Sequence, residues 1–263
     1  LLIIWRFLFA MSNESVFLCF SSKDRDPYIH AVAYHLKSFG LSIWYDYDNL
    51  HLGNDRNKKN MIEPFKKSNY SVIFISNNLF NSKCAVEELN KIMSLKDKGM
   101  YIIPVFLDYL PQTLNPNLSW IVNLIYQEAS KTDDAMNLTL KIVDAVLQNE
   151  LGKLTDIDTS FNALIADISN SADWKLKSIA TLLSDYQNIE ESNVNAKSAM
   201  LYSIFSFLNV KKESKLIRID KMAERIFSLT KLDIPVNEYH INIFENIVKT
   251  IIITMLNKTC QIL

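Results

Sequence analysis

The sequence predicts an α/β protein whose first part is a doubly wound parallel sheet of five strands, followed by a small all-helical domain. Up to about residue 150, short runs rich in β-branched and aromatic residues alternate with amphipathic stretches, a pattern typical of βαβ units. Beyond residue 150 the strand-like runs stop, and apolar residues recur at helical spacing. The 263 residues suffice for two small domains, and 49% hydrophobic residues with only 4 Gly and 6 Pro indicate a packed chain.

The expected strands are nearly continuous apolar runs, as in strands that are buried on both faces of a sheet. In chain order they are VFLCF (16–20), LSIWY (41–45), SVIFIS (71–76), YIIPVFL (101–107) and NLIYQ (123–127).

Helices are expected between these strands, at 27–39, 55–67, 82–97 and 133–149. Gly40 stands where the first helix should stop, and Asn81 or Ser82 stands where the third should be capped. Pro64 lies inside the second helix and predicts that this helix is short or kinked.

The second part of the chain contains five segments with helical periodicity: 155–169, 174–187, 197–209, 213–230 and 239–257. We therefore expect an N-terminal extension at 1–13, a sheet domain at 14–150 and a helical domain at 151–263. The helical domain is expected to serve oligomerisation or sensing.

Residues 1–10 (LLIIWRFLFA) are apolar and precede Met11. They lack the basic region and small-residue cleavage site of a signal peptide, and are shorter than the ~20 residues that span a bilayer. The apolar stretch 247–256 is also short and is interrupted by Lys249. We expect a soluble, cytoplasmic protein without a stable membrane span.

The charge balance argues against a nucleic-acid-binding protein, and the cysteines argue against a disulfide framework or a zinc site. A formal net charge of −1 gives no basic field for nucleic acid, so we expect no nucleic-acid partner. Cys19, Cys84 and Cys260 are far apart, with no C-x-x-C motif and no nearby His at metal-ligand spacing. We expect reduced thiols and no metal site.

Ligands of doubly wound sheets bind at the carboxyl ends of the strands, which selects the loops 21–26, 46–55 and 77–89. No G-x-G-x-x-G or P-loop motif is present, so the usual dinucleotide and nucleoside triphosphate modes are excluded. A phosphoacceptor receiver domain would need an Asp at the end of the third strand, where Ser76 and Asn77 stand.

Four segments carry a resemblance to a known family. VFLCFSSKD (16–24) resembles the first box of a TIR (Toll/interleukin-1 receptor) domain, and WYDYDNLHLGND (44–55) resembles its second strand and BB loop. SNNLFNSKCAVEELNKI (76–92) is similar to the segment with the catalytic glutamate of NAD-cleaving TIR domains, and IIPVF (102–106) is similar to the fourth strand. The resemblance implies a flavodoxin-like fold over about residues 14–150. It does not extend to 151–263.

The resemblance also implies site residues. The family's glutamate lies four residues after a frequent Trp and just before a Leu, which selects Glu88, after Cys84 and before Leu89, over the neighbouring Glu87. The resemblance implies NAD+ as a substrate and no cofactor. The residues assigned to NAD+ binding are Phe20, Ser21, Ser22, Lys23, Asp24, Trp44, Asp46, Gly53 and Cys84.

One carboxylate can suffice for such chemistry, because the ribose becomes oxocarbenium-like and the pyridinium leaves without protonation. Phe20 and Trp44 could stack on the substrate's rings. The residues alone also allow structural interpretations. Glu88 could merely interact favourably with a helix dipole, and Phe20 and Trp44 could be core residues. Asp24 and Asp26 could cap the first helix.

The leading hypothesis is an NAD+ glycohydrolase that releases nicotinamide and either ADP-ribose or a cyclised ADP-ribose. The arrangement of a TIR domain before a helical module, with a Lys- and Asn-rich composition, favours a bacterial defence protein, such as an antiviral one, or an effector. The resemblance implies activation by self-association through TIR–TIR contacts at the loop 46–55. The alternatives are a non-enzymatic TIR signalling scaffold and a nucleoside deoxyribosyltransferase-like enzyme, which shares the strand order and a catalytic glutamate.

Overall fold

The computed structural model describes residues 15–55, 57–155, 158–208, 216–232 and 234–259. The predicted extension at 1–13 and Cys260 lie outside the described residues. The chain divides into two compact units, Leu1–Thr139 with Ser214–Arg218, and Leu140–Glu213 with Ile219–Leu263. Each unit is described by itself.

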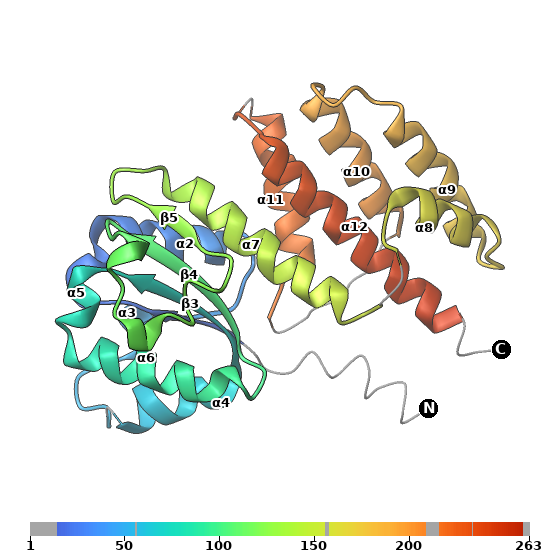
Figure 1. Cartoon of the computed structure of the whole chain (residues 1–263). Helices are drawn as coiled ribbons and strands as arrows, with labels where there is room; N and C mark the ends of the chain where they lie inside the picture. The colour runs from blue at the N-terminus through green and yellow to red at the C-terminus, as the bar shows by residue number, and fades with distance from the viewer. Residues whose placement is uncertain (1–14, 56, 156–157, 209–215, 233, 260–263) are drawn as a thin grey trace. The chain divides into compact units, whose positions relative to one another are not determined.

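The first unit is built on a parallel sheet with the strand order β2-β1-β3-β4-β5 (Figure 1). Its strands are β1 (Ser15–Cys19), β2 (Ile43–Trp44), β3 (Ser68–Ile75), β4 (Tyr101–Leu107) and β5 (Gln127–Ala129). All four strand pairings are parallel. This order is that of the flavodoxin-like fold, and it confirms the predicted fold class.

Helices and single turns connect the strands. After β1 come η1 (Ser22–Asp24), η2 (Arg25–Ile29) and α2 (His30–Ser38). After β2 come α3 (Asp46–Asn49), η3 (Asn57–Ile62) and α4 (Glu63–Lys67), and after β3 come α5 (Asn77–Phe80) and α6 (Lys83–Lys96). The turns η4 (Pro111–Thr113) and η5 (Pro116–Leu118) precede β5, and α7 (Ala135–Gly152) follows it.

Both faces of the sheet are buried, as the continuous apolar runs predicted. α4 and α6 lie on one side of the sheet and α2 lies on the other (Figure 1). On the first side, the strands and helices share one apolar cluster, which includes Phe17, Cys19, Phe65, Ile73, Ile75, Leu89, Ile92 and Phe106. The alternate strand residues Val16, Leu18, Val72 and Phe74 are buried as well. The sheet is therefore a firm base for the loops at its carboxyl edge.

Three residues that were predicted to end, cap or interrupt helices do so in the structure. Gly40 adopts φ +83° directly after α2. The Ser82 hydroxyl accepts a hydrogen bond from the Ala85 N–H at 3.4 Å and caps α6, whereas Asn81 ends α5. Pro64 lies in the first turn of α4, and the helix expected over 55–67 is divided into the π-helical η3 and the short α4.

Three segments of the first unit differ from the predictions. β5 begins at Gln127, whereas the expected strand covered 123–127. β2 has only two residues, because the backbone before it pairs elsewhere: Leu41 bridges Ile217, and the Ser42 N–H donates to the Leu216 carbonyl at 2.8 Å. Leu216 and Ile217 lie within the segment 213–230 that was expected to be helical, but the helix there begins only at Ile219. They satisfy polar backbone groups beside the short edge strand.

The second unit is helical. Besides part of α7 it contains α8 (Phe161–Ser169), α9 (Trp174–Gln187), α10 (Val194–Leu208), α11 (Ile219–Lys231) and α12 (Glu238–Thr259). α8 contacts α9 and α12, and α10 contacts α9, α11 and α12. α8 begins later than predicted, because Ser160 caps it by accepting the Ala163 N–H at 3.3 Å. Among the described residues no helix is both long and apolar enough to cross a bilayer.

Candidate active site

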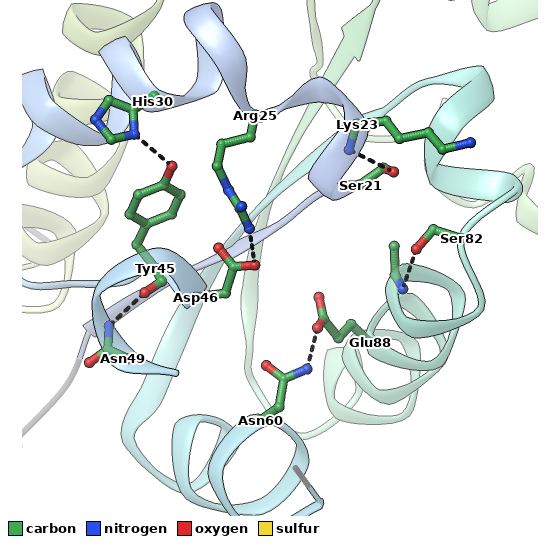
Figure 2. A network of polar contacts seen from close by, with 11 residues as sticks. Ser21, Lys23, Arg25, His30, Tyr45, Asp46, Asn49, Asn60, Ser82 and Glu88 are labelled. Carbon is green, nitrogen blue, oxygen red and sulfur yellow. Dashed lines mark hydrogen bonds and ion pairs between the residues drawn. The ribbon is translucent and has the colours of Figure 1, made fainter. Parts of the chain in front are cut away.

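Polar side chains from four elements gather at the carboxyl edge of the sheet (Figure 2). Ser21 and Arg25 come from the loop after β1, Asp46 begins α3, Asn60 lies on η3 and Glu88 lies on α6. The three loops selected from the sequence thus supply most of this cluster. Asn60 comes from a segment that the sequence did not select.

Glu88 is the buried acid of this cluster. It lies on α6 after the Ser82 cap, and it is only 7% exposed. The Asn60 side-chain Nδ2 donates a hydrogen bond to Glu88 Oε1 at 2.6 Å. Figure 2 shows both side chains pointing toward one another beneath Asp46. A carboxylate held by a short, charge-assisted hydrogen bond is fixed in position.

Cys19 of β1 packs beneath the same carboxylate. Its Sγ lies 3.8 Å from the carbonyl oxygen of Ala85, and its thiol is hydrogen-bonded to Glu88. Burial raises the pKa of the Cys19 thiol, and the charge of Glu88 and its hydrogen bond raise it further. The thiol therefore stays protonated and belongs to the packed base of the site.

Arg25 and Asp46 form an ion pair beside Glu88. Arg25 Nη2 lies 2.6 Å from Asp46 Oδ2, and both side chains are mostly buried. Burial raises the pKa of the Asp46 carboxyl, and the Arg25 guanidinium opposes this shift without cancelling it. Arg25 was not singled out from the sequence.

Asp24 does not cap the helix that follows it, and its carboxylate is bound within the domain. Its side chain makes no cap hydrogen bond and is fully buried. Three donors bind its carboxylate: Ser76 Oγ at 2.5 Å, Asn78 Nδ2 at 2.6 Å and Lys131 Nζ at 2.7 Å. Burial by itself would raise the pKa of this carboxyl, but these donors outweigh it and hold the pKa below its ordinary value. Asp24 anchors the loop after β1.

The remaining residues assigned to NAD+ divide into buried and exposed groups. Phe20 is buried and packs on Tyr45, with ring centroids 5.6 Å apart, and Trp44 stacks on Phe17 at 4.9 Å. Both rings thus have protein partners. Ser21 is buried and accepts the Lys23 N–H at 3.4 Å. Exposed positions are Ser22, Lys23, Gly53 and Cys84.

Two of these exposed residues have distinct surroundings. Gly53 adopts φ +84° in the loop between α3 and η3, a conformation that favours glycine. Cys84 is a free thiol on α6, one turn before Glu88. Across the described residues, no group of His, Cys, Asp and Glu side chains is placed to hold a metal ion.

The TIR domain family matches residues 16–139. Residues 16–139 form a TIR domain. The match ends at Thr139, where the first compact unit also reaches its boundary. The sheet order and the site at its carboxyl edge therefore belong to a TIR domain.

The TIR domain region also resembles curated proteins at low identity. The chain is 27% identical over 97 residues to NAD(+) hydrolase TcpC of Escherichia coli O6:H1, covering 36% of this chain and 31% of the relative. It is 25% identical over 136 residues to NAD(+) hydrolase TcpA of a Theionarchaea archaeon, covering 51% and 41%. It is 34% identical over 77 residues to the "Probable 2' cyclic ADP-D-ribose synthase TcpO" of Methanobrevibacter olleyae, covering 29% and 22%. The chain thus spans less than half the length of each of these relatives, and no solved structure gives a significant match.

Proposed function

We propose that the TIR domain of this chain cleaves NAD+ at the nicotinamide N-glycosidic bond, with Glu88 as the catalytic residue. The observation that carries the proposal is the buried Glu88 carboxylate, which Asn60 fixes at the carboxyl edge of the sheet. Relatives named as NAD(+) hydrolases support the choice of substrate.

In the proposed reaction the bond between C1′ of the ribose and the pyridinium nitrogen breaks, and nicotinamide takes the bonding electron pair. Positive charge then develops on the ribose ring. The negative charge of the buried Glu88 carboxylate stabilises it at short range. Attack of water on C1′ and loss of a proton give ADP-ribose. Attack by a hydroxyl of the same molecule gives a cyclised ADP-ribose.

The groups after β1 and β2 would hold the rest of the substrate. Ser21, Ser22 and Lys23 offer hydroxyl and ammonium groups to the diphosphate, and the Arg25–Asp46 pair borders the carboxylate. Tightly packed Phe20 and Trp44 support these loops from below. The site thus combines fixed charges with a packed apolar base.

Activation by self-association is the second part of the proposal. The segment after β2 exposes two large apolar side chains. Leu52 is fully exposed, and Tyr47 is 60% exposed. Exposed apolar groups on a loop next to a site favour contact with another protein. We place this activity in a cytoplasmic defence or effector protein whose helical unit sets the oligomeric state.

The test is to incubate the purified full chain with NAD+ and to follow nicotinamide release by chromatography. We expect Glu88→Gln, which keeps the size of the side chain, to lower turnover about 10²- to 10³-fold without changing the thermal unfolding midpoint. Glu87→Gln is the matched control and should retain turnover. Full turnover in folded Glu88→Gln protein, or an equal loss in both variants, would contradict the assignment.

The same assay separates the two alternatives. A non-enzymatic scaffold releases no nicotinamide at any protein concentration. A nucleoside deoxyribosyltransferase-like enzyme moves deoxyribose between bases and leaves NAD+ intact.

A further inference from the structure

Asn60 occupies an unusual position for an amide on a helical segment that is otherwise rich in exposed residues. Its side chain is 4% exposed, whereas Asn57 on the same segment η3 is exposed. Only the Nδ2 group of an amide can donate to a carboxylate, so the 2.6 Å contact with Glu88 Oε1 fixes which way the Asn60 amide faces. Its carbonyl oxygen Oδ1 must therefore point to the other side.

That carbonyl oxygen is buried and has no hydrogen-bond partner among the described residues. Buried polar atoms in native proteins are normally satisfied, so an unpaired oxygen beside a candidate catalytic carboxylate indicates a donor that arrives with a ligand. The nearby Asp46 carboxylate is a further acceptor, although it is already engaged, since Arg25 binds its Oδ2 and the Tyr47 backbone N–H donates to the carboxylate.

The chemistry of these atoms limits the ligand group. Asn60 Oδ1, Asp46 Oδ1 and the Glu88 carboxylate are all hydrogen-bond acceptors. A phosphate brings acceptors and negative charge, so it does not suit this cluster. A sugar with two adjacent hydroxyl groups brings donors and no charge, and it does.

From this arrangement we infer that Asn60 is a second functional residue of the site, which positions the Glu88 carboxylate through Nδ2 and accepts a hydrogen bond from a ribose hydroxyl through Oδ1. The ribose is the one that carries nicotinamide, since its C1′ is the reacting atom. This inference rests on the proposed function and adds to it a determinant for hydroxylated ribose.

Two substitutions at Asn60 separate positioning from a packing role. Asn60→Leu keeps the branched shape and the number of side-chain heavy atoms, and removes both polar atoms. We expect kcat/KM for NAD+ to fall about 10- to 100-fold, as for loss of a hydrogen bond to a charged group. Asn60→Asp keeps the shape, and its carboxyl can donate to Glu88 only when protonated. We therefore expect its activity to have a more acidic pH optimum than that of the wild-type protein.

Other titratable or charged groups near Asn60 and Glu88 also bear on the pH profile. These are Cys19 on β1, Arg25 on η2, Asp46 on α3, and Lys58 and Lys59 on η3 itself. Asn57→Asp introduces the same charge on the same segment at an exposed position, so it is the matched control. A shift seen with Asn60→Asp and absent from Asn57→Asp comes from the contact with Glu88.

The hydroxyl contact is tested with NAD+ analogues that lack the 2′- or the 3′-hydroxyl of the nicotinamide ribose. If Asn60 Oδ1 accepts from one of these groups, removing that hydroxyl costs less in Asn60→Leu than in the wild-type protein. If, for both analogues, the loss of activity from removing the hydroxyl is the same in Asn60→Leu as in the wild-type protein, this contact does not exist.

The positioning role also has a readout that does not depend on turnover. Carbon-13 NMR titration of the Glu88 carboxyl should give a higher pKa in Asn60→Leu than in the wild-type protein, because a donor to the charged form is lost. An unchanged pKa in folded Asn60→Leu protein would overturn the positioning role. If Asn60→Leu fails to fold, a wild-type pH profile in Asn60→Asp would overturn it instead. If the wild-type protein does not cleave NAD+, the proposed function and the ribose contact fail together, and the NMR titration alone decides the positioning role.

Discussion

The Lys131 ammonium lies 2.7 Å from the fully buried Asp24 carboxylate, and the two residues come from distant parts of the TIR domain. Asp24 follows the interior strand β1, and Lys131 follows the edge strand β5. Because Ser76 and Asn78 after β3 bind the same carboxylate, Asp24 joins loops from three strands. The loop after β1, which also carries Ser21 and Arg25, is held in place by this contact.

Removing the lysine should destabilise the domain. Lys131→Met leaves a charged carboxylate buried with one donor fewer, and we expect the free energy of unfolding to fall by about 1.5–3 kcal/mol. Lys98→Met is the control, since Lys98 is exposed after α6, and it should stay within about 0.5 kcal/mol. Urea denaturation of both variants measures the difference. Equal stability of the two would show that the ion pair contributes nothing.

The same carboxylate should make stability depend on pH at the acidic end. The pKa of Asp24 is lower in the folded protein than its ordinary value of 3.8. A group with a lowered folded pKa contributes stability that is present above the unfolded pKa and lost as pH falls through the folded one. Stability should therefore drop below about pH 4, and this drop should be smaller in Asp24→Asn. Urea midpoints measured between pH 6 and pH 2 test this, and identical pH profiles for the two proteins would refute it.

The Arg25–Asp46 pair gives a prediction about activity. Arg25→Met removes the charge that opposes the effect of burial on Asp46, so the pKa of the Asp46 carboxyl should rise further. We expect turnover of NAD+ to fall about 10-fold at neutral pH and its acid limb to move to higher pH. The exposed pair Lys37–Asp48 provides the control, because Lys37→Met breaks a surface ion pair that is worth little. A pH profile that is the same in both variants would exclude a role of Arg25 in the site.

The sequence predicted the sheet well because its signals are local. Apolar runs marked β1, β3 and β4, and Gly40, Pro64 and Ser82 marked helix boundaries. β2 was predicted too long, because Leu41 just before it bridges Ile217, a residue beyond α10 that no local pattern connects to it.

The same difference between local sequence signals and contacts made by distant residues explains which site residues the sequence predicted. The rule that ligands bind at the carboxyl ends of strands selected the loops with Asp46 and Glu88. Asn60 and Lys131 were missed, because a polar residue within a polar stretch gives no sign of burial. Asn60 turns inward on the π-helical η3, whose spacing departs from the regular helical period used to find apolar faces.

The last prediction concerns the loop after β2 and self-association. Gly53 has φ +84°, and a Cβ added there would meet no atom within 4 Å. Gly53→Ala therefore introduces backbone strain of about 1 kcal/mol and no clash, and it should disturb the loop more than the fold. Gly99 is a matched control, because its φ is +93° and a Cβ there also meets open space, but it lies in the turn between α6 and β4. Both variants should lose similar stability, whereas only Gly53→Ala should weaken self-association and the rise of specific activity with protein concentration. Light scattering and turnover across a dilution series measure both quantities. If the wild-type protein is a monomer with turnover independent of concentration, or if Gly99→Ala has the same effect as Gly53→Ala, assembly through this loop does not control the activity.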